Sequence, residues 1–337
     1  MSGNPTAVLT EPGKISLEDR NVPVPGPHDV LVEIRSVGVC GSDVHYYEHG
    51  RIGDFVVRAP LVLGHEASGF VLQAGTASRM PKGQRVAIEP GWPDGTCEQC
   101  LTGQYNLCPE VSFLATPPVD GAFTRLLVVP EQFAHPVPDS LSDDAAALIE
   151  PLSVGIAACR KAGVRPGSRV LISGGGPVGL LVGEVARASG ATTVVVLEPN
   201  SDRRARAAAI SSADIRDVDG LDPDQQFDMF IECSGAASAI LIGLDRLRPA
   251  STAVLVGMGA DTASLPIALI QMKELLITGT FRYANTFPQA IALAASGRIN
   301  LDDLVDARFG LDEVEAALTA NRNDPTLMKV VVSPRPA

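Results

Sequence analysis

The sequence predicts a two-domain α/β protein, with a mostly-β first domain and a second domain built on a doubly wound parallel sheet. Residues 1–150 carry short runs of alternating apolar and polar residues bordered by Gly and Pro, as half-buried strands do. From residue 169, short apolar strands alternate with amphipathic helices, which is the pattern of βαβ units. We expect residues 286–337 to complete the first domain and residues 151–285 to form the second.

The elements follow in order along the chain. In the first domain we expect strands in residues 25–40, 69–75, 84–90 and 122–130. In the second domain, strands at 169–173 and 192–198 each precede a helix, one from Pro177 and one through Arg206. Three further strands are expected at 227–233, 252–258 and 275–281. The tail predicts helices and one last strand, at 327–333.

Composition and charge exclude several classes of function. The 337 residues carry a net charge of −12 without any block of Lys or Arg, so a nucleic-acid partner is not expected. Apolar runs stop well short of the ~20 residues that a membrane span needs. The first residues lack a basic start followed by an apolar core, so we expect no secretory signal and a cytoplasmic location.

A glycine-rich turn follows the strand at 169–173. Gly174, Gly176 and Gly179 form a G-x-G-x-x-G pattern, and Pro177 and Val178 open a helix with apolar residues at helical spacing. Such glycines allow a tight turn, and they let the backbone approach a pyrophosphate at the helix N-terminus. The turn therefore predicts a dinucleotide site. The alternative is a glycine-rich turn in a domain of this kind that binds something else.

The next strand ends in an acidic residue, Glu198. A carboxylate at this point accepts hydrogen bonds from the adenosine ribose and repels a 2′-phosphate, which favours NAD over NADP. Arg203 and Arg204 follow closely and argue in the opposite direction, because either could contact a phosphate or stack on adenine.

Candidate metal ligands occur in two places. Cys40 precedes Gly41, Ser42 and Asp43, and His65 and Glu66 follow later in the chain. Thiolate, imidazole and carboxylate together suit Zn²⁺. Taken singly, each residue is also typical of an ordinary core position. Three of the six cysteines fall within twelve residues, which in a reducing compartment points to a metal before disulfides.

These motifs resemble the zinc-dependent medium-chain alcohol dehydrogenases. Cys-Gly-Ser-Asp followed by Gly-His-Glu is similar to their catalytic zinc signature, and the stretch 44–69 resembles the sorbitol and polyol dehydrogenase branch. Segments 115–118, 150–153 and 281–286 match this branch as well. The resemblance implies a GroES-like catalytic domain, a Rossmann NAD-binding domain and a homotetramer.

The resemblance also assigns metal ligands. It implies that Cys40, His65 and Glu66 hold the catalytic zinc, with Glu150 close by as a direct ligand or bonded to the zinc-bound water. The second site is Asp94, Cys97, Cys100 and Cys108, where relatives carry four cysteines around a structural zinc. Carboxylate oxygen is a legitimate zinc ligand, so we favour zinc over a metal-free lobe. Cys159 and Cys233 are expected to be buried structural residues.

The implied reaction is reversible oxidation of an alcohol, with zinc as Lewis acid and hydride passing to NAD. Ser42 would take the proton, the nicotinamide ribose would pass it on, and His45 would release it. The alternative reading is a turn hydroxyl and a surface histidine. Mixed aromatic and polar pocket walls suit a polyol, which this branch oxidises at carbon 2 to a ketose. The residues that the resemblance places in the pocket are Tyr46, Phe55, Phe113, Glu150, Arg282 and Tyr283.

Other substrates and one other class of protein compete with this interpretation. Threonine, aldose and aminocyclitol dehydrogenases share the fold and much of the zinc signature. A non-catalytic dinucleotide-binding protein would share the fold without the activity. Such a protein should have lost ligands or relay residues, whereas this chain retains both.

Overall fold

The computed structural model describes residues 3–260 and 262–334, which form two compact units. One unit consists of Met1–Glu150 together with Phe287–Ala337, and the other is Pro151–Thr286. Among the described residues, no helix is both long enough and apolar enough to cross a membrane.

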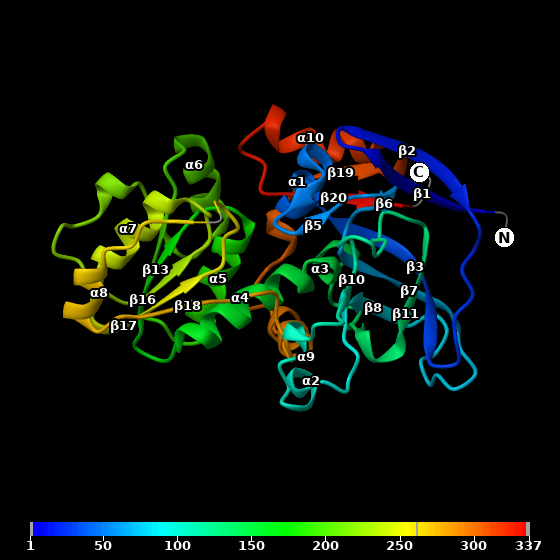
Figure 1. The fold of residues 1–337 in the computed structure, drawn as a ribbon, viewed down its shortest axis with the longest axis horizontal. Coiled ribbons are helices and arrows are strands. Elements are labelled where there is room, and N and C mark those ends of the chain that lie inside the picture. Colours follow the sequence, from blue (N-terminus) through cyan, green and yellow to red (C-terminus); the bar gives the residue numbers. More distant parts are fainter. Residues whose placement is uncertain (1–2, 261, 335–337) are drawn as a thin grey trace. The chain divides into compact units, whose positions relative to one another are not determined.

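The first unit is built around a seven-stranded sheet (Figure 1). Its central strand β3 (Asp29–Gly38) pairs antiparallel with β7, with β11 and with the C-terminal strand β20. The strand order is β12-β8-β7-β3-β20-β19, with β11 alongside β3. The other strands of this sheet are β7 (Glu66–Ala74), β8 (Arg85–Ile88), β11 (Leu126–Pro130), β12 (Ala134–Pro136), β19 (Val305–Gly310) and β20 (Lys329–Ser333).

The prediction of a single strand in the tail is wrong, because β19 precedes β20 and pairs with it in parallel. Strand β19 lies at the sheet edge and carries Asp306 and Arg308, so it lacks the apolar run that marks a buried strand. Smaller strands and short helices complete the first unit. They are β1 (Asn4–Glu11), β2 (Lys14–Arg20), β4 (Arg51–Ile52), β5 (Phe55–Val56), β6 (Leu61–Val62), β9 (Gly91–Trp92), β10 (Ser112–Phe113), α1 (Gly41–His49), α2 (Glu98–Leu101), α3 (Asp143–Ala147), α9 (Phe287–Ala295) and α10 (Val314–Asn323).

The second unit is a doubly wound domain. Its six strands run in the order β15-β14-β13-β16-β17-β18 and every pair is parallel. The order reverses between β13 and β16, where such sheets bind their ligands. The strands are β13 (Arg169–Ser173), β14 (Thr193–Leu197), β15 (Asp214–Arg216), β16 (Phe227–Glu232), β17 (Leu247–Leu255) and β18 (Leu276–Gly279); the helices are α4 (Ile149–Ala162), α5 (Pro177–Ala188), α6 (Ser201–Ile210), α7 (Ala237–Asp245) and α8 (Ile267–Lys273).

Each unit has its own apolar core. In the first, Leu9, Ile34 and Phe123 are fully buried, and in the second Phe227 and Phe230 lie beneath the helices. Burial of such a side chain contributes roughly 1.5–3 kcal/mol each.

The two cysteines outside the candidate metal sites differ in burial. Cys159 is buried in α4, as expected. Cys233 is half-buried as a residue, but burial raises the pKa of its thiol well above the ordinary value, so the prediction holds for the sulfur and not for the whole residue. It follows the last residue of β16, and its backbone N–H still donates to the Ser173 oxygen of β13 at 2.9 Å.

Candidate metal centres and cofactor site

Cys40, His65 and Glu66 form one cluster in the first unit. Each offers a ligand atom, and these atoms all lie within 4.8 Å of one another. Gly38 at the end of β3 pairs with Glu66 at the start of β7, so the two strands bring Cys40 next to His65. The cluster therefore depends on long-range strand pairing rather than on closeness in sequence.

Asp43 organises the first two members of this cluster. It is fully buried, and its carboxylate accepts hydrogen bonds from the backbone N–H of Cys40 (3.0 Å) and of Gly64 (2.9 Å). It also lies 3.6 Å from His65 Nδ1. A carboxylate at Nδ1 orients the ring and leaves Nε2 for a metal. Sequence reasoning assigned Asp43 no role, although it stands within the Cys-Gly-Ser-Asp motif.

The charges of Asp43 and His65 depend on each other. Burial alone would raise the pKa of Asp43, but the charge and hydrogen bond of His65 outweigh it, and the pKa is lowered. Burial alone would lower the pKa of His65, but the charge of Asp43 raises that pKa well above its ordinary value. Each of the two groups therefore stabilises the charged form of the other.

Glu66 is buried and contacts a buried lysine. Lys329 Nζ lies 2.5 Å from Glu66 Oε1 and 3.0 Å from the carbonyl oxygen of Val39. The other oxygen, Glu66 Oε2, is buried without a hydrogen-bond partner among the described residues. An unpaired buried carboxylate oxygen is costly, so it fits a position that a cation completes. Sequence reasoning missed Lys329, because it lies in a run that reads only as an apolar strand.

Glu150 is buried at the start of α4 but does not belong to the group of three donors. Its charge acts on Lys329. Burial lowers the pKa of Lys329, yet the charges of Glu66, Cys40 and Glu150 together raise it above the ordinary value. The structure therefore places Glu150 near the cluster without making it a member.

The predicted relay residues lie on α1. Ser42 is half-buried and His45 is exposed. His45 Nδ1 lies 2.8 Å from the carbonyl oxygen of Arg51. Because that oxygen only accepts, neutral His45 carries its proton on Nδ1 and keeps a basic Nε2.

The predicted pocket residues have different surroundings. The ring of Phe113 lies 5.8 Å from that of His65, so this residue does line the cluster. Tyr46 is buried on α1, whereas Phe55 in β5 is 42% exposed. Arg282 and Tyr283 belong to the second unit, where Arg282 adopts a left-handed backbone with φ of 55°.

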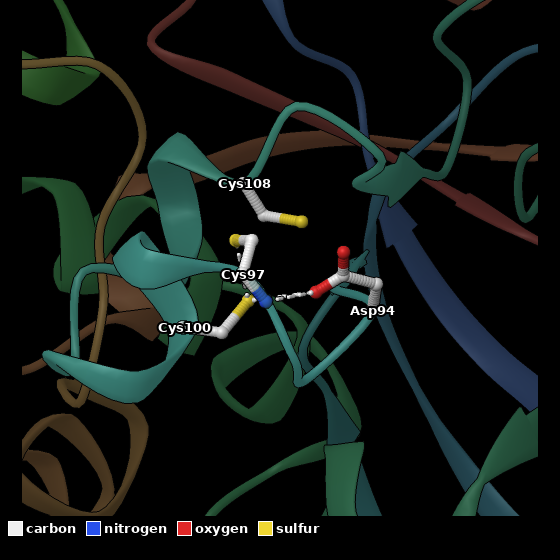
Figure 2. Close-up of side chains that lie close together, drawn as sticks. All are labelled: Asp94, Cys97, Cys100 and Cys108. Atoms are coloured by element: carbon white, nitrogen blue, oxygen red, sulfur yellow. Dashed lines mark hydrogen bonds between the residues drawn. The ribbon is translucent and has the colours of Figure 1, made fainter.

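The second cluster consists of Asp94, Cys97, Cys100 and Cys108, whose donor atoms also lie within 4.8 Å of one another (Figure 2). Asp94 Oδ1 accepts from the backbone N–H of Thr96 (2.8 Å) and of Cys97 (3.1 Å). Cys100 Sγ lies 3.3 Å both from this oxygen and from Cys97 Sγ. Helix α2 begins directly after Cys97, which places Cys97 and Cys100 one turn apart.

The electrostatics of this second cluster favour a cation. The backbone N–H groups of Thr96 and Cys97 lower the pKa of Asp94 to about 2. Burial, followed by hydrogen bonds to Cys97 and Asp94, raises the pKa of the Cys100 thiol to about 12. A bound metal reverses that preference, because a coordinating thiol loses its proton. Three thiols and a carboxylate at these separations fit a closed zinc site.

The loop that carries the second cluster is also attached to the sheet without a metal. Tyr105 donates to Glu89 Oε1 at 2.6 Å, and His135 Nε2 lies 2.8 Å from Glu89 Oε2. Trp92 Nε1 donates to the backbone oxygen of Glu89 at 3.0 Å. These contacts link the lobe to strands β8 and β12.

The glycine-rich turn has the geometry of a dinucleotide site. Gly174 has φ of 94°, and a Cβ at Gly179 would lie 1.9 Å from the Gly174 oxygen, so neither position accepts a side chain. Helix α5 begins at Pro177, after Gly176 as its N-cap residue, with Val178 in its first turn. The turn follows β13, next to β16, where the strand order reverses.

Glu198 and the neighbouring arginines are held in place. Glu198 is buried and accepts from the backbone N–H of Gly175 and of Asn200, both at 3.0 Å. Arg204 donates to the Glu198 carbonyl oxygen at 2.8 Å and pairs with Asp217 at 3.1 Å. The backbone of Arg203 is bonded to the Asn200 side chain at the start of α6. An acidic group thus stands directly behind the glycine-rich turn.

Comparison with known proteins places the chain in a family. Residues 26–139 match the model of the alcohol dehydrogenase GroES-like domain, and residues 177–296 match that of zinc-binding dehydrogenases. Sorbitol dehydrogenases are similar over most of their length: that of Mus musculus is 44% identical over 95% of this chain and 93% of its own, and that of Homo sapiens is 42% identical over 92% and 90%.

Solved structures agree with these matches. L-idonate 5-dehydrogenase from Escherichia coli superposes with a TM-score of 0.92 at 30% identity, covering 98% of each chain. The 2R,3R-butanediol dehydrogenase from Bacillus subtilis gives a TM-score of 0.90 at 27% identity, covering 98% of this chain and all of its own. The fold class and the enzyme class predicted from the sequence are confirmed. The chain belongs to the zinc-dependent medium-chain alcohol dehydrogenases, in the branch of the sorbitol dehydrogenases.

Proposed function

We propose that this protein oxidises a polyol to a ketose, with NAD as hydride acceptor and zinc held by Cys40, His65 and Glu66. The observation that carries the proposal is this cluster, in which His65 and Glu66 are buried, Cys40 is half-buried, and one carboxylate oxygen of Glu66 has no partner among the described residues. When bound, zinc supplies Lewis-acid polarisation of the substrate hydroxyl. The identity of the substrate class rests on the relatives, which act on sorbitol and on L-idonate.

The residues of α1 would move the proton that alcohol oxidation releases. The Ser42 hydroxyl would accept it near the substrate while giving up its own proton through the nicotinamide ribose hydroxyl, and His45 would deliver that proton to solvent from an exposed position. Because Nδ1 of His45 is already committed to the Arg51 carbonyl, Nε2 is the atom that carries the proton.

The proposed pocket combines apolar and polar walls. Phe113 stands beside His65, and buried Glu150 adds a carboxylate that can accept from substrate hydroxyls. Tyr46 and Phe55 of the same unit are proposed to line the remainder. Hydroxyls along a polyol chain need such partners, since unpaired ones lose their hydration without compensation.

Glu198 is proposed to select NAD. A related zinc-binding dehydrogenase from Sinorhizobium meliloti, 29% identical, was solved with NADP, and an alcohol dehydrogenase from Escherichia coli, 26% identical, was solved with NADH, so the fold accepts either cofactor. In Glu198→Gln the side chain keeps a carbonyl oxygen as acceptor for the turn but loses its charge. We expect the NAD-over-NADP preference in kcat/KM to fall at least about tenfold, the value of one charge-assisted hydrogen bond. An unchanged ratio would remove Glu198 from cofactor selection.

We also propose a cytoplasmic location and a homotetramer. All six cysteines are unpaired, which suits a reducing compartment. Strand β18 lies at the sheet edge with Leu276 61% exposed, and Ile267 and Met272 of α8 are exposed as well, which is apolar surface that assembly would cover. Light scattering coupled to size-exclusion chromatography measures the assembly directly.

The test of the main proposal is a panel of initial rates. Nicotinamide reduction is measured with sorbitol, xylitol, other alditols, threonine, glucose and simple alcohols, with NAD and NADP in parallel. Turnover with NAD on alditols alone supports the proposal and names the substrate. Turnover only with threonine, an aldose, an aminocyclitol or a simple alcohol keeps the zinc dehydrogenase and rejects the polyol. Stoichiometric zinc without any turnover would indicate a non-catalytic dinucleotide-binding protein.

A further inference from the structure

Lys329 is a buried cation that faces the proposed metal ligands from strand β20. It is 4% exposed, and its ammonium group contacts both Glu66 Oε1 and the carbonyl oxygen of Val39, the residue before Cys40. The backbone N–H of Val39 also donates to the Val330 oxygen at 2.9 Å. The lysine is therefore bound to the backbone beside one proposed ligand and to the side chain of another.

Stability alone does not account for this pair. Removing two charges from water costs about as much as their attraction returns, so an apolar residue among the valines of β20 would serve packing equally well. Its ammonium group instead contacts the side chain of one proposed ligand and the backbone beside another. This placement indicates a role in the arrangement of the donors.

The two oxygens of Glu66 have different surroundings. Oε1 is engaged by Lys329, whereas Oε2 is buried without a partner among the described residues. A Cβ built on Gly38, the residue paired with Glu66 across the strands, would lie 2.0 Å from Oε2. The glycine thus leaves the space that this oxygen uses, and only this oxygen remains available to a cation.

We propose that Lys329 is a positioning residue that holds one oxygen of Glu66, so that the carboxylate offers a metal ion only the other. The inference rests on the metal site proposed above. A carboxylate binds a metal through one oxygen or through two. Restricting Glu66 to one oxygen keeps a coordination position free, and a catalytic zinc needs that position for its substrate.

The test uses the full chain loaded with Co²⁺, whose visible absorption reports coordination number. A difference spectrum against Cys40→Ser isolates the bands of the proposed catalytic site from those of the Asp94 cluster. In Lys329→Met both oxygens of Glu66 become free, and we expect the visible bands to weaken as coordination rises from four to five. The kcat for a polyol should fall about 10- to 100-fold, as when an outer partner of a metal ligand is lost.

Two control variants sharpen this result. Lys329→Arg keeps a charged donor and should keep the wild-type spectrum. Arg308→Met removes an exposed cation from the neighbouring strand β19, where it pairs with Asp144, and should also leave the spectrum unchanged. A purely structural lysine would shift the thermal midpoint in Lys329→Met without a change in the cobalt bands.

A double variant avoids leaving a buried charge unpaired. In Glu66→Gln we expect Lys329 to hold the amide oxygen and turn the amide nitrogen toward the metal, so cobalt binding weakens. Adding Lys329→Met removes both charges and frees the amide oxygen, so cobalt binding recovers. If the lysine change leaves the cobalt bands and cobalt binding unaltered in both backgrounds, Lys329 does not position Glu66. Wild-type protein without any Cys40-dependent cobalt band would overturn the metal site itself and this inference with it.

Discussion

The two donor clusters of the first unit are assembled in opposite ways. Cys40, His65 and Glu66 come from segments that only the pairing of β3 and β7 brings together, and His65 and Glu66 are buried. The second cluster takes all four donors from one loop, residues 94–108, and three of them are half-buried or exposed. One cluster is created by the tertiary fold, while the other is largely created by local backbone turns.

The difference extends to the groups around the donors. Asp43 and Lys329 orient the buried cluster from α1 and β20, so its donors are arranged before any metal arrives. Asp94 is instead held by the backbone of its own loop, at Thr96 and Cys97. We infer that the buried cluster suits a catalytic zinc, because its three donors leave one coordination position open. The loop cluster, with four donors, suits a structural zinc.

The variant with the largest expected effect on the difference between the two clusters is Cys40→Ser. We expect loss of one zinc per chain and a fall in kcat of at least about 10³-fold, since the Lewis acid contributes several kcal/mol. Elemental analysis should still find the zinc of the Asp94 cluster. Cys159→Ser, a buried thiol of α4 outside both clusters, is the matched control and should retain both metals. Loss of both metals from Cys40→Ser would show that the clusters are not independent.

A smaller effect is expected from Asp43→Asn, which keeps the shape of the side chain but removes its charge. The asparagine orients His65 less firmly, so zinc affinity should fall about 10- to 100-fold. Competition with a chelator measures this affinity. Asp214→Asn changes an exposed carboxylate of the second unit and should leave it unchanged. Equal affinity in Asp43→Asn and wild type would deny the carboxylate its orienting role.

The same contrast explains what could be predicted from the sequence. The spacing of Cys97, Cys100 and Cys108 indicates a cluster without knowledge of the fold, because one loop supplies every donor. Periodicity likewise predicts the alternating strands and helices of the second unit, where β13, β14 and β16 are largely buried apolar runs. Local patterns suffice wherever the structure is itself local.

The supporting residues that the sequence did not predict depend on distant contacts. Lys329 lies within an apolar strand, and only the pairing of β20 with β3 brings it to Glu66. Two other differences have local causes: strand β19 was missed because an exposed edge strand tolerates charges, and the strand predicted at 227–233 ends one residue earlier, at Glu232. The closeness of Cys40 and His65 was predicted only from the family resemblance. The sequence pattern alone does not reveal the strand pairing that brings them together.

Cys97→Ser tests the loop cluster and should have a modest effect. Loss of its zinc should lower the thermal midpoint by a few degrees, roughly 3–6 °C, because part of the folding free energy comes from metal binding. The lobe should stay attached through the hydrogen bond of Tyr105 to Glu89. Because the two clusters share no contacting residues, kcat should change less than about threefold. Differential scanning calorimetry and initial rates measure the two effects. A collapse of activity would mean that this lobe supports the reacting groups.

The smallest effect is expected from Asp94→Cys, which converts the loop cluster to four thiolates. Sulfur is a softer donor than a carboxylate oxygen, so zinc should be retained about tenfold more strongly against a chelator. The gain is limited because Asp94 Oδ1 also caps the backbone N–H groups of Thr96 and Cys97, which a thiolate accepts more weakly. Activity should not change, because Asp43 and Lys329, which contact the donors of the first cluster, lie outside this loop. If the variant instead lost zinc, the hydrogen bonds of Asp94 would matter more to the site than the identity of the donor atom, and the loop cluster would prove as dependent on its surroundings as the buried one.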